Sequence, residues 1–180
     1  MKYIIASDIH GSAYWCKKLI DVIDEVKPDE ILLLGDILYH GPRNDLPEDY
    51  SPKKVIAMLN PLADKITSCR GNCDAEVDQM LLEFPCLSDY ALVMDEGKRL
   101  FLTHGHIYNE EKMPKGKTDL FFYGHTHLWK LEKSGDHVVC NVGSISLPKG
   151  GNPPTYAMYE AGQIEVFNLD NREILASLSL

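Results

Sequence analysis

The sequence predicts an α/β protein in which a parallel sheet from the first half packs against a second, mixed sheet from the second half. Residues 3–83 alternate between short apolar runs and amphipathic stretches, which is typical of right-handed βαβ units. Residues 92–179 carry strand and turn patterns with little helix. The 180 residues can bury a sizeable core, and no linker or repeat divides them. We therefore expect a single domain over residues 1–180.

The first half alternates strands with helices. Short apolar runs predict three buried strands, at residues 3–6, 30–34 and 65–69. Apolar residues spaced three and four apart, together with capping signals, predict three helices, at residues 12–26, 51–59 and 74–83. Pro52 fits the first turn of the second helix, because that position needs no backbone N–H.

The second half is expected to form hairpins. Strand patterns on either side of short glycine-containing turns predict hairpins at residues 92–103, 129–141 and 156–168. Further strands are expected at residues 120–123 and 172–179. Exposed edges of such strands can pair between subunits, which favours a homo-oligomer.

Composition and charge argue against several classes of protein. The formal net charge is −9 with histidines neutral, so we expect no general binding of nucleic acid. No apolar run approaches the ~18 residues that span a bilayer, so we expect no membrane partner.

The five cysteines indicate a reducing environment. Their number is odd and no signal-peptide pattern precedes them, so we expect a cytoplasmic protein without a disulfide framework. Cys69 and Cys73 have the spacing of half a zinc clamp, but no second pair completes it.

Polar side chains follow five of the predicted strands at the point where each strand ends. Two Asp, one Asn and four His occupy these positions: Asp8, His10, Asp36, Asn72, His104, His125 and His127. Because ligands bind beyond the carboxyl ends of strands in α/β sheets, we expect these side chains to converge. Taken singly, an Asp-x-His or Gly-Asn pair is more often a cap or a turn, but five such sites after five strands argue against that interpretation.

The inventory suits two divalent ions better than one. Seven ligands exceed the four of a tetrahedral zinc site, and one carboxylate can be shared as a bridge. Mixed nitrogen and oxygen donors favour Mn²⁺, Fe²⁺, Zn²⁺, Co²⁺ or Ni²⁺ over Ca²⁺. Two ions about 3.5–4 Å apart can clamp the attacking and leaving oxygens of a phosphoryl displacement and turn a bridging water into hydroxide.

These motifs resemble those of the calcineurin-like metallophosphoesterases. The resemblance runs through Asp8-Ile9-His10, Gly35-Asp36, Gly71-Asn72-Cys73-Asp74, Thr103-His104-Gly105-His106 and Gly124-His125-Thr126-His127. Within the family, the chain is similar to the YfcE-like branch of small bacterial and archaeal phosphodiesterases. This closer similarity runs through His40-Gly41-Pro42-Arg43-Asn44, Gly71-Asn72-Cys73-Asp74, residues 77–82 and Pro148-Lys149-Gly150-Gly151-Asn152-Pro153.

The resemblance implies an αββα four-layer sandwich of two mixed β-sheets flanked by helices. It also implies a dinuclear-metal phosphodiesterase that hydrolyses small phosphodiesters, with Mn²⁺ as the usual ion of the branch. One metal would be held by Asp8, His10, Asp36 and His127. The other would be held by Asp36, Asn72, His104 and His125, with Asp36 as the bridge.

Cys73 departs from the family pattern. Many members of the family carry a His at this position, and that His is thought to protonate the leaving group. A thiol of pKa ~8.5 is a weaker acid than an imidazole of pKa near 6.5. Asp36, Asn72, Cys73 and Asp74 are the candidate catalytic residues, with His40 and His106 as alternative proton donors. Simple solvation of a loop is the other interpretation of His40.

Arg43 and Asn44 are candidate phosphate ligands, because the fork of an Arg side chain matches a phosphate group.

A phosphomonoesterase or protein phosphatase is the alternative enzyme. A non-catalytic scaffold of the retromer type is the alternative outside catalysis, although such a member would show broken ligands and this chain retains all seven.

Overall fold

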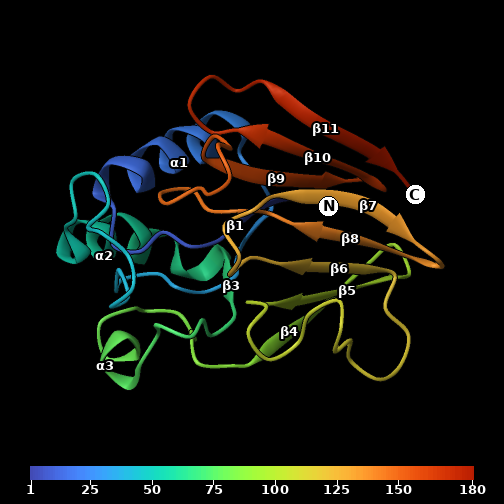
Figure 1. Ribbon diagram of the computed structural model, residues 1–180, viewed down its shortest axis with the longest axis horizontal. Coiled ribbons are helices and arrows are strands. Elements are labelled where there is room, and N and C mark those ends of the chain that lie inside the picture. The colour runs from blue at the N-terminus through green and yellow to red at the C-terminus, as the bar shows by residue number, and fades with distance from the viewer.

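A computed structural model, which describes residues 1–180, contains two mixed β-sheets packed face to face (Figure 1). The first sheet has the strand order β11-β10-β9-β1-β2-β3 and the second has the order β4-β5-β6-β8-β7. This arrangement confirms the predicted α/β class with two mixed sheets.

The first sheet begins with the three parallel strands expected from the first half: β1 (Lys2–Ala6), β2 (Glu30–Leu33) and β3 (Ile66–Ser68). Its other three strands come from the end of the chain: β9 (Thr155–Glu160), β10 (Gln163–Asn168) and β11 (Ile174–Ser179). The expectation that these late strands belong to the second sheet was wrong. β9 instead pairs antiparallel with the free edge of β1, which places β1 in the middle of the first sheet.

The second sheet is built from the middle of the chain. Its strands are β4 (Tyr90–Asp95), β5 (Lys98–Thr103), β6 (Leu120–Tyr123), β7 (Lys130–Ser134) and β8 (His137–Asn141). β5, β6 and β8 run parallel, while β4 and β7 are antiparallel edge strands. The two predicted hairpins of this region, β4–β5 and β7–β8, are both present.

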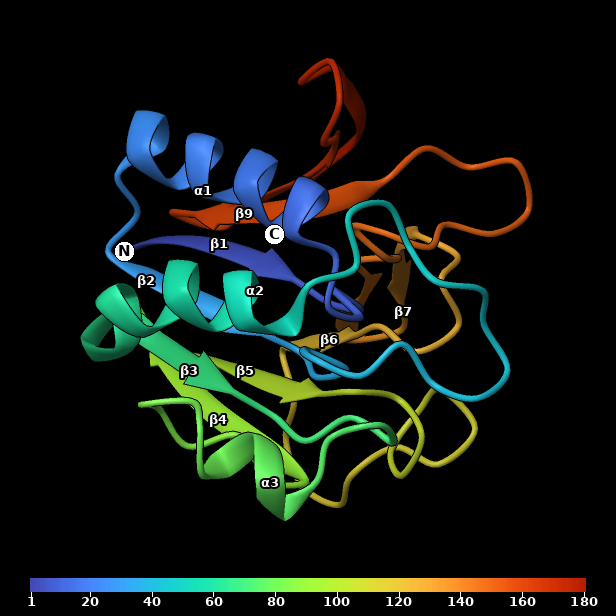
Figure 2. The same cartoon turned by 90° about the vertical axis from the view of Figure 1, so that its left-hand side faces the viewer.

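Two helices cover the outer face of the first sheet, α1 (Ala13–Val26) and α2 (Pro52–Leu59) (Figure 2). Ser12 caps α1 by accepting a hydrogen bond from the Trp15 N–H at 3.3 Å. A 3-10 helix (Asn60–Lys65) follows α2. No helix is both long and apolar enough to cross a membrane.

The third predicted helix is shorter than expected. α3 (Glu76–Gln79) has one turn rather than the ten residues of 74–83. The side chain of Gln79 bonds to the backbone of Leu82, Phe84 and Cys86, and these bonds fix the irregular segment that follows the single turn.

The alternation of side chains along β1 divides the core in two. Ile4 and Ala6 pack against the helices, whereas Tyr3 and Ile5 pack against the second sheet. On the outer face of the second sheet, the aromatic side chains are covered by Tyr108 and Met113 of the loop after β5 rather than by a helix. The helices that flank the sandwich are therefore few.

Candidate metal centre

Five of the seven candidate ligands occupy left-handed backbone conformations. They lie just beyond β1, β2 and β6, with φ of 56° for Asp8, 48° for His10, 54° for Asp36, 65° for His125 and 61° for His127. Each such conformation costs about 1–3 kcal/mol for a residue with a side chain. The strands therefore end in tight turns that aim these side chains toward one place, and such clustered strain is typical of functional sites.

The first group of donors comes from the loops after β1, β2 and β6. Asp8 Oδ1 lies 3.2 Å from His127 Nε2 and 3.4 Å from His10 Nε2. The two imidazole Nε2 atoms are 3.3 Å apart, and His10 Nε2 is 3.6 Å from Asp36 Oδ2. These four atoms belong to the residues that the resemblance assigns to one metal.

The second group shares Asp36 with the first. His104 Nε2 lies 3.4 Å from Asp36 Oδ2, 3.1 Å from Asn72 Oδ1 and 3.2 Å from His125 Nδ1. Metal–ligand bonds of about 2.1 Å place neighbouring donors about 3.0–3.4 Å apart, so the spacing in both groups is that of a coordination shell. Asp36 Oδ2 lies 3.6 Å from His10 Nε2 of the first group and 3.4 Å from His104 Nε2 of the second, so this atom can be shared by both groups.

Backbone carbonyls orient three of the histidines. His10 Nδ1 is 2.8 Å from Tyr39 O, His104 Nδ1 is 2.7 Å from Leu34 O, and His127 Nδ1 is 2.6 Å from Leu147 O. A carbonyl oxygen only accepts, so each Nδ1 carries the proton and each Nε2 turns a lone pair toward the cluster. This is the outer-shell arrangement found around metal-bound histidine.

The buried oxygen Asp8 Oδ1 supplies the test of whether a cation fits. Asp8 is fully buried, and its Oδ2 accepts hydrogen bonds from Ser7 Oγ at 2.7 Å and from the His125 N–H at 2.9 Å. Its Oδ1 faces His10 and His127 with no hydrogen-bond partner. Lone pairs that face one another in a dry site repel unless a positive charge lies between them, so the donor set fits a divalent cation.

The titration of the cluster indicates the same need for positive charge. Burial opposes ionisation of Asp8, but His104, His10 and His127 more than offset it and hold the Asp8 pKa well below its usual range. Burial likewise opposes protonation of His104, yet Asp8 and Asp36 raise the pKa of this imidazole to about 9.

Asp74 supports the centre from behind rather than facing it. Its carboxylate accepts backbone hydrogen bonds from Asp36 at 2.8 Å, Ile37 at 2.9 Å and Gly71 at 2.7 Å. These bonds tie the loop after β3 to the loop after β2. The carboxylate of Asp36 is held in turn by the Cys73 N–H, which donates to its Oδ1 at 2.7 Å and leaves Oδ2 for the cluster.

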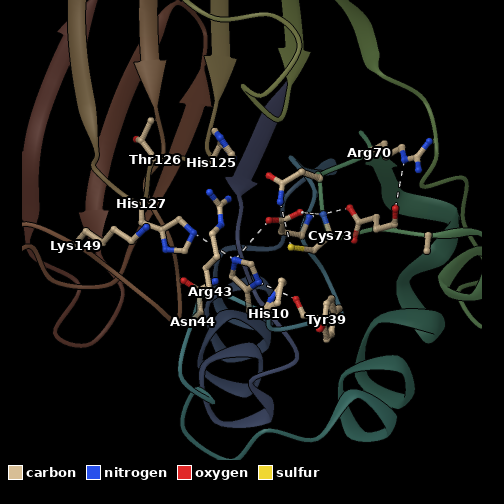
Figure 3. A pocket seen from close by; sticks show the side chains of 16 residues that line it. His10, Tyr39, Arg43, Asn44, Arg70, Cys73, His125, Thr126, His127 and Lys149 are labelled. Carbon is tan, nitrogen blue, oxygen red and sulfur yellow. Dashed lines mark hydrogen bonds and ion pairs between the residues drawn. The ribbon is translucent and has the colours of Figure 1, made fainter.

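A cavity of about 860 Å³ opens over the cluster (Figure 3). Arg43 and Asn44, the predicted phosphate ligands, both line it, as do Cys73 and Asp74. In Figure 3 the Arg43 side chain extends toward the centre of the cavity beside His10 and His127.

Sequence reasoning missed three residues that line the same cavity, Tyr39, Arg70 and Lys149. The signal for Lys149 was its glycine-rich loop, whose length alone suggests function. Arg70 directly precedes the Gly71-Asn72 pair, but a single basic residue there carries no distinctive pattern. Together with Arg43, Arg70 and Lys149 place three basic side chains around one cavity, which in a chain of charge −9 indicates an anionic ligand.

The two alternative proton donors lie outside the residues that line the cavity. The His40 ring packs edge-on against Tyr39 and Tyr50, with centroid distances of 4.8 and 5.2 Å. The His106 ring packs edge-on against His104 at 5.3 Å. Both rings therefore act first as packing groups around the centre.

The fold and the cluster together define a metallophosphoesterase, and comparison with known proteins confirms that class. Residues 1–163 match the family model of the Calcineurin-like phosphoesterase superfamily domain. The chain therefore belongs to the calcineurin-like phosphoesterase superfamily.

Two relatives and two solved structures are similar to the chain. Phosphodiesterase YfcE of Escherichia coli K12 is 44% identical over 181 residues, which cover 100% of this chain and 98% of the relative. Phosphodiesterase MJ0936 of Methanocaldococcus jannaschii is 26% identical, covering 79% of this chain and 83% of its own. The solved structure of the E. coli YfcE phosphoesterase superimposes with a TM-score of 0.97 over 99% of both chains. Zinc-complexed Vps29 of Entamoeba histolytica, at 18% identity and a TM-score of 0.66 over 99% of both chains, shows the fold alone.

Proposed function

We propose that the protein is a metal-dependent phosphodiesterase that hydrolyses small phosphodiesters at a dinuclear centre. The observation that carries the proposal is the pair of donor groups that share Asp36 Oδ2. The similarity to YfcE, which is named a phosphodiesterase, supports the reaction class.

Seven side chains would hold the two ions. One ion would be bound by Asp8, His10, Asp36 and His127, and the other by Asp36, Asn72, His104 and His125. We propose Mn²⁺ as the native ion, although the same donors suit Zn²⁺, Fe²⁺, Co²⁺ and Ni²⁺. When bound, two such ions would polarise the phosphoryl group and supply a water nucleophile at neutral pH.

The basic residues of the cavity would bind the substrate. Arg43 can donate two parallel hydrogen bonds to a nonbridging phosphate oxygen pair, while Asn44, Arg70 and Lys149 add polar and positive groups around it. These donors also stabilise the charge that grows on the equatorial oxygens in the transition state. Asp74 would act as a positioning residue, because its carboxylate holds the backbone of the residue that bridges the two groups.

Cys73 lies beside the centre with its proton retained. Burial and the neighbouring Asp36 raise the pKa of the thiol to about 12. A group of this pKa protonates a departing alkoxide poorly at neutral pH, so the preferred leaving groups would be those that need little protonation. His40 and His106 stay candidate donors only through a movement of their rings.

The remaining features of the proposal concern the whole chain. We treat residues 1–180 as one metallophosphoesterase domain. All five cysteines are free and four are buried, which suits a reducing cytoplasm. β4 and β11 each end a sheet and have no strand partner on one side, which favours a homo-oligomer.

The proposal is tested by hydrolysis of bis(p-nitrophenyl) phosphate by Mn²⁺-loaded protein. Loss of a residue that only supports a metal ligand typically lowers metal affinity or activity 10–100-fold. Asp36 is proposed as a direct ligand, so Asp36→Ala should lower kcat/KM by more than about 100-fold. Asp136→Ala, an exposed carboxylate in the turn between β7 and β8, is the control and should leave kcat/KM unchanged. Faster hydrolysis of p-nitrophenyl phosphate than of the diester would favour a phosphomonoesterase. Metal-replete protein inactive on both esters would contradict catalysis altogether.

A further inference from the structure

A second hollow, of about 680 Å³, adjoins the cavity over the metal centre. It lies between the start of α2 and the segment around α3, and we call it the apolar groove. Its walls are mostly hydrophobic and include Tyr50, Ile56, Val77 and Leu81, whereas the cavity over the centre is lined mostly by polar and charged side chains.

Three residues line both hollows, Tyr39, Cys73 and Ala75. Cys73 Sγ lies within 4.8 Å of both a carboxylate oxygen of Asp36 and a ring nitrogen of His10. In Figure 3, Cys73 and Tyr39 lie on the side of the cavity opposite Lys149 and His127. A substituent attached directly to a phosphoryl group at the centre therefore enters the apolar groove past Cys73 without a long spacer.

The groove exposes apolar surface that a ligand would cover. Val77 is 57% exposed, Leu81 49% and Tyr39 41%. Removing apolar surface from water is favourable in proportion to its area, and a concave apolar wall beside a polar site is typical of a small-molecule pocket. The polar side chain Asp78 at this wall is already engaged, since its carboxylate accepts the Ala75 N–H at 2.8 Å.

We propose that the apolar groove binds an uncharged aromatic or alkyl substituent of the substrate while the centre binds its phosphoryl group. The preferred substrates would then be diesters with one apolar ester group rather than diesters of two sugars. This inference rests on the proposed function for the placement of the phosphoryl group.

The test is calorimetric binding of benzylphosphonate and methylphosphonate to the Mn²⁺-loaded protein. Each probe has a single substituent, so its orientation is not ambiguous. We expect benzylphosphonate to bind at least about tenfold more tightly, because its ring would be buried in the apolar groove. The double variant Val77→Ser with Leu81→Ser should lose most of this preference. Both residues are about half-exposed, so serine is tolerated by the fold.

Met80 offers a matched control. It lies between Val77 and Leu81 in sequence, is 83% exposed and does not line the groove, so Met80→Ser should keep the full preference. Equal affinity for the two phosphonates, failure of both to bind, or a preference that survives in the double variant would overturn the inference. Hydrolysis of bis(p-nitrophenyl) phosphate is measured in parallel. If the protein is inactive but still prefers benzylphosphonate, the proposed function is refuted and the binding role of the apolar groove is retained.

Discussion

Replacing Gly71 by alanine is expected to disable the candidate metal centre without removing any of its proposed ligands. A Cβ at this position would lie 2.1 Å from Asp36 Oδ1 and 2.3 Å from the Asp36 backbone nitrogen. Ordinary van der Waals contact begins at 3.4 Å, so the loops after β2 and β3 must separate by about 1.3 Å, a shift large enough to disturb catalytic geometry. The backbone of Gly71 is not in the left-handed region, so the effect of alanine comes from this contact alone.

The magnitude follows from the contact. Overpacking a well-packed site costs about 1–3 kcal/mol, which in a chain of this size lowers Tm by about 2–12 °C. Displacing the shared carboxylate by about 1 Å is expected to lower kcat/KM by about 100-fold. Both Mn²⁺ sites should weaken together, because Asp36 Oδ2 is close to both donor groups.

Three measurements check the prediction: the thermal unfolding curve of the metal-free protein, the Mn²⁺ binding isotherm, and kcat/KM on bis(p-nitrophenyl) phosphate. Gly135→Ala is the matched control, since that glycine has a φ of +59° and open space around its Cβ position. The control should lose about 1–2 kcal/mol of stability through backbone strain but keep its metal affinity and activity. Wild-type Mn²⁺ affinity and kcat/KM in Gly71→Ala would refute the reasoning that the close approach of the two loops places Asp36.

Three further predictions concern the same centre. In Gly124→Ala, the added Cβ would lie 2.2 Å from Ser7 Oγ and 2.6 Å from Asp8 Oδ2. Because Asp8 belongs to only one of the two donor groups, this substitution should weaken one Mn²⁺ binding step more than the other. Two equally affected binding steps in calorimetry would contradict this. After metal is removed with EDTA, adding Mn²⁺ at about 100 times its Kd should raise the free energy of unfolding by about 2.7 kcal/mol and Tm by about 5–11 °C. A Tm that does not change on addition of Mn²⁺ would exclude a site of this kind. Arg43→Ala should lower kcat/KM on the diester by about 10–100-fold with unchanged Mn²⁺ affinity, as expected for a lost charge-assisted hydrogen bond. Lys149→Ala should lower kcat/KM less, because the ammonium group of Lys is a point charge that cannot form the two parallel hydrogen bonds of an Arg side chain.

The sequence predicted the fold best where a short apolar strand is followed directly by a turn. The runs that became β1, β2 and β3 were recognisable because each is short, apolar and followed by a polar pair beside glycine. The family resemblance, now confirmed, came from those turns together with the His-containing turns at residues 103–106 and 124–127. The assignment of individual ligands to two ions stays a prediction, although the structure places all seven side chains in the two groups that were expected.

Long-range pairing decided what local patterns leave open. The last three strands have the same hairpin pattern as β4–β5, and only the free edge of β1 determined that they join the first sheet. The segment after α3 has an apolar pattern compatible with helix, but in the structure it is irregular and its end is held by the side chain of Gln79, which bonds to the backbone of Phe84 and Cys86.

The sequence by itself determined the strand runs, the glycine-containing turns and the candidate ligands that follow the strands, because each of these signals depends on residues within a few positions of one another. Only the tertiary structure decided that Asp74 supports the backbone of Asp36, that Arg70 and Lys149 face the cavity, and that an apolar groove opens beside Cys73. Each of these features joins segments distant in the chain. Their proximity depends on which sheet edges pair and how loops pack, and these choices are made by the free energy of the whole fold rather than by any local pattern.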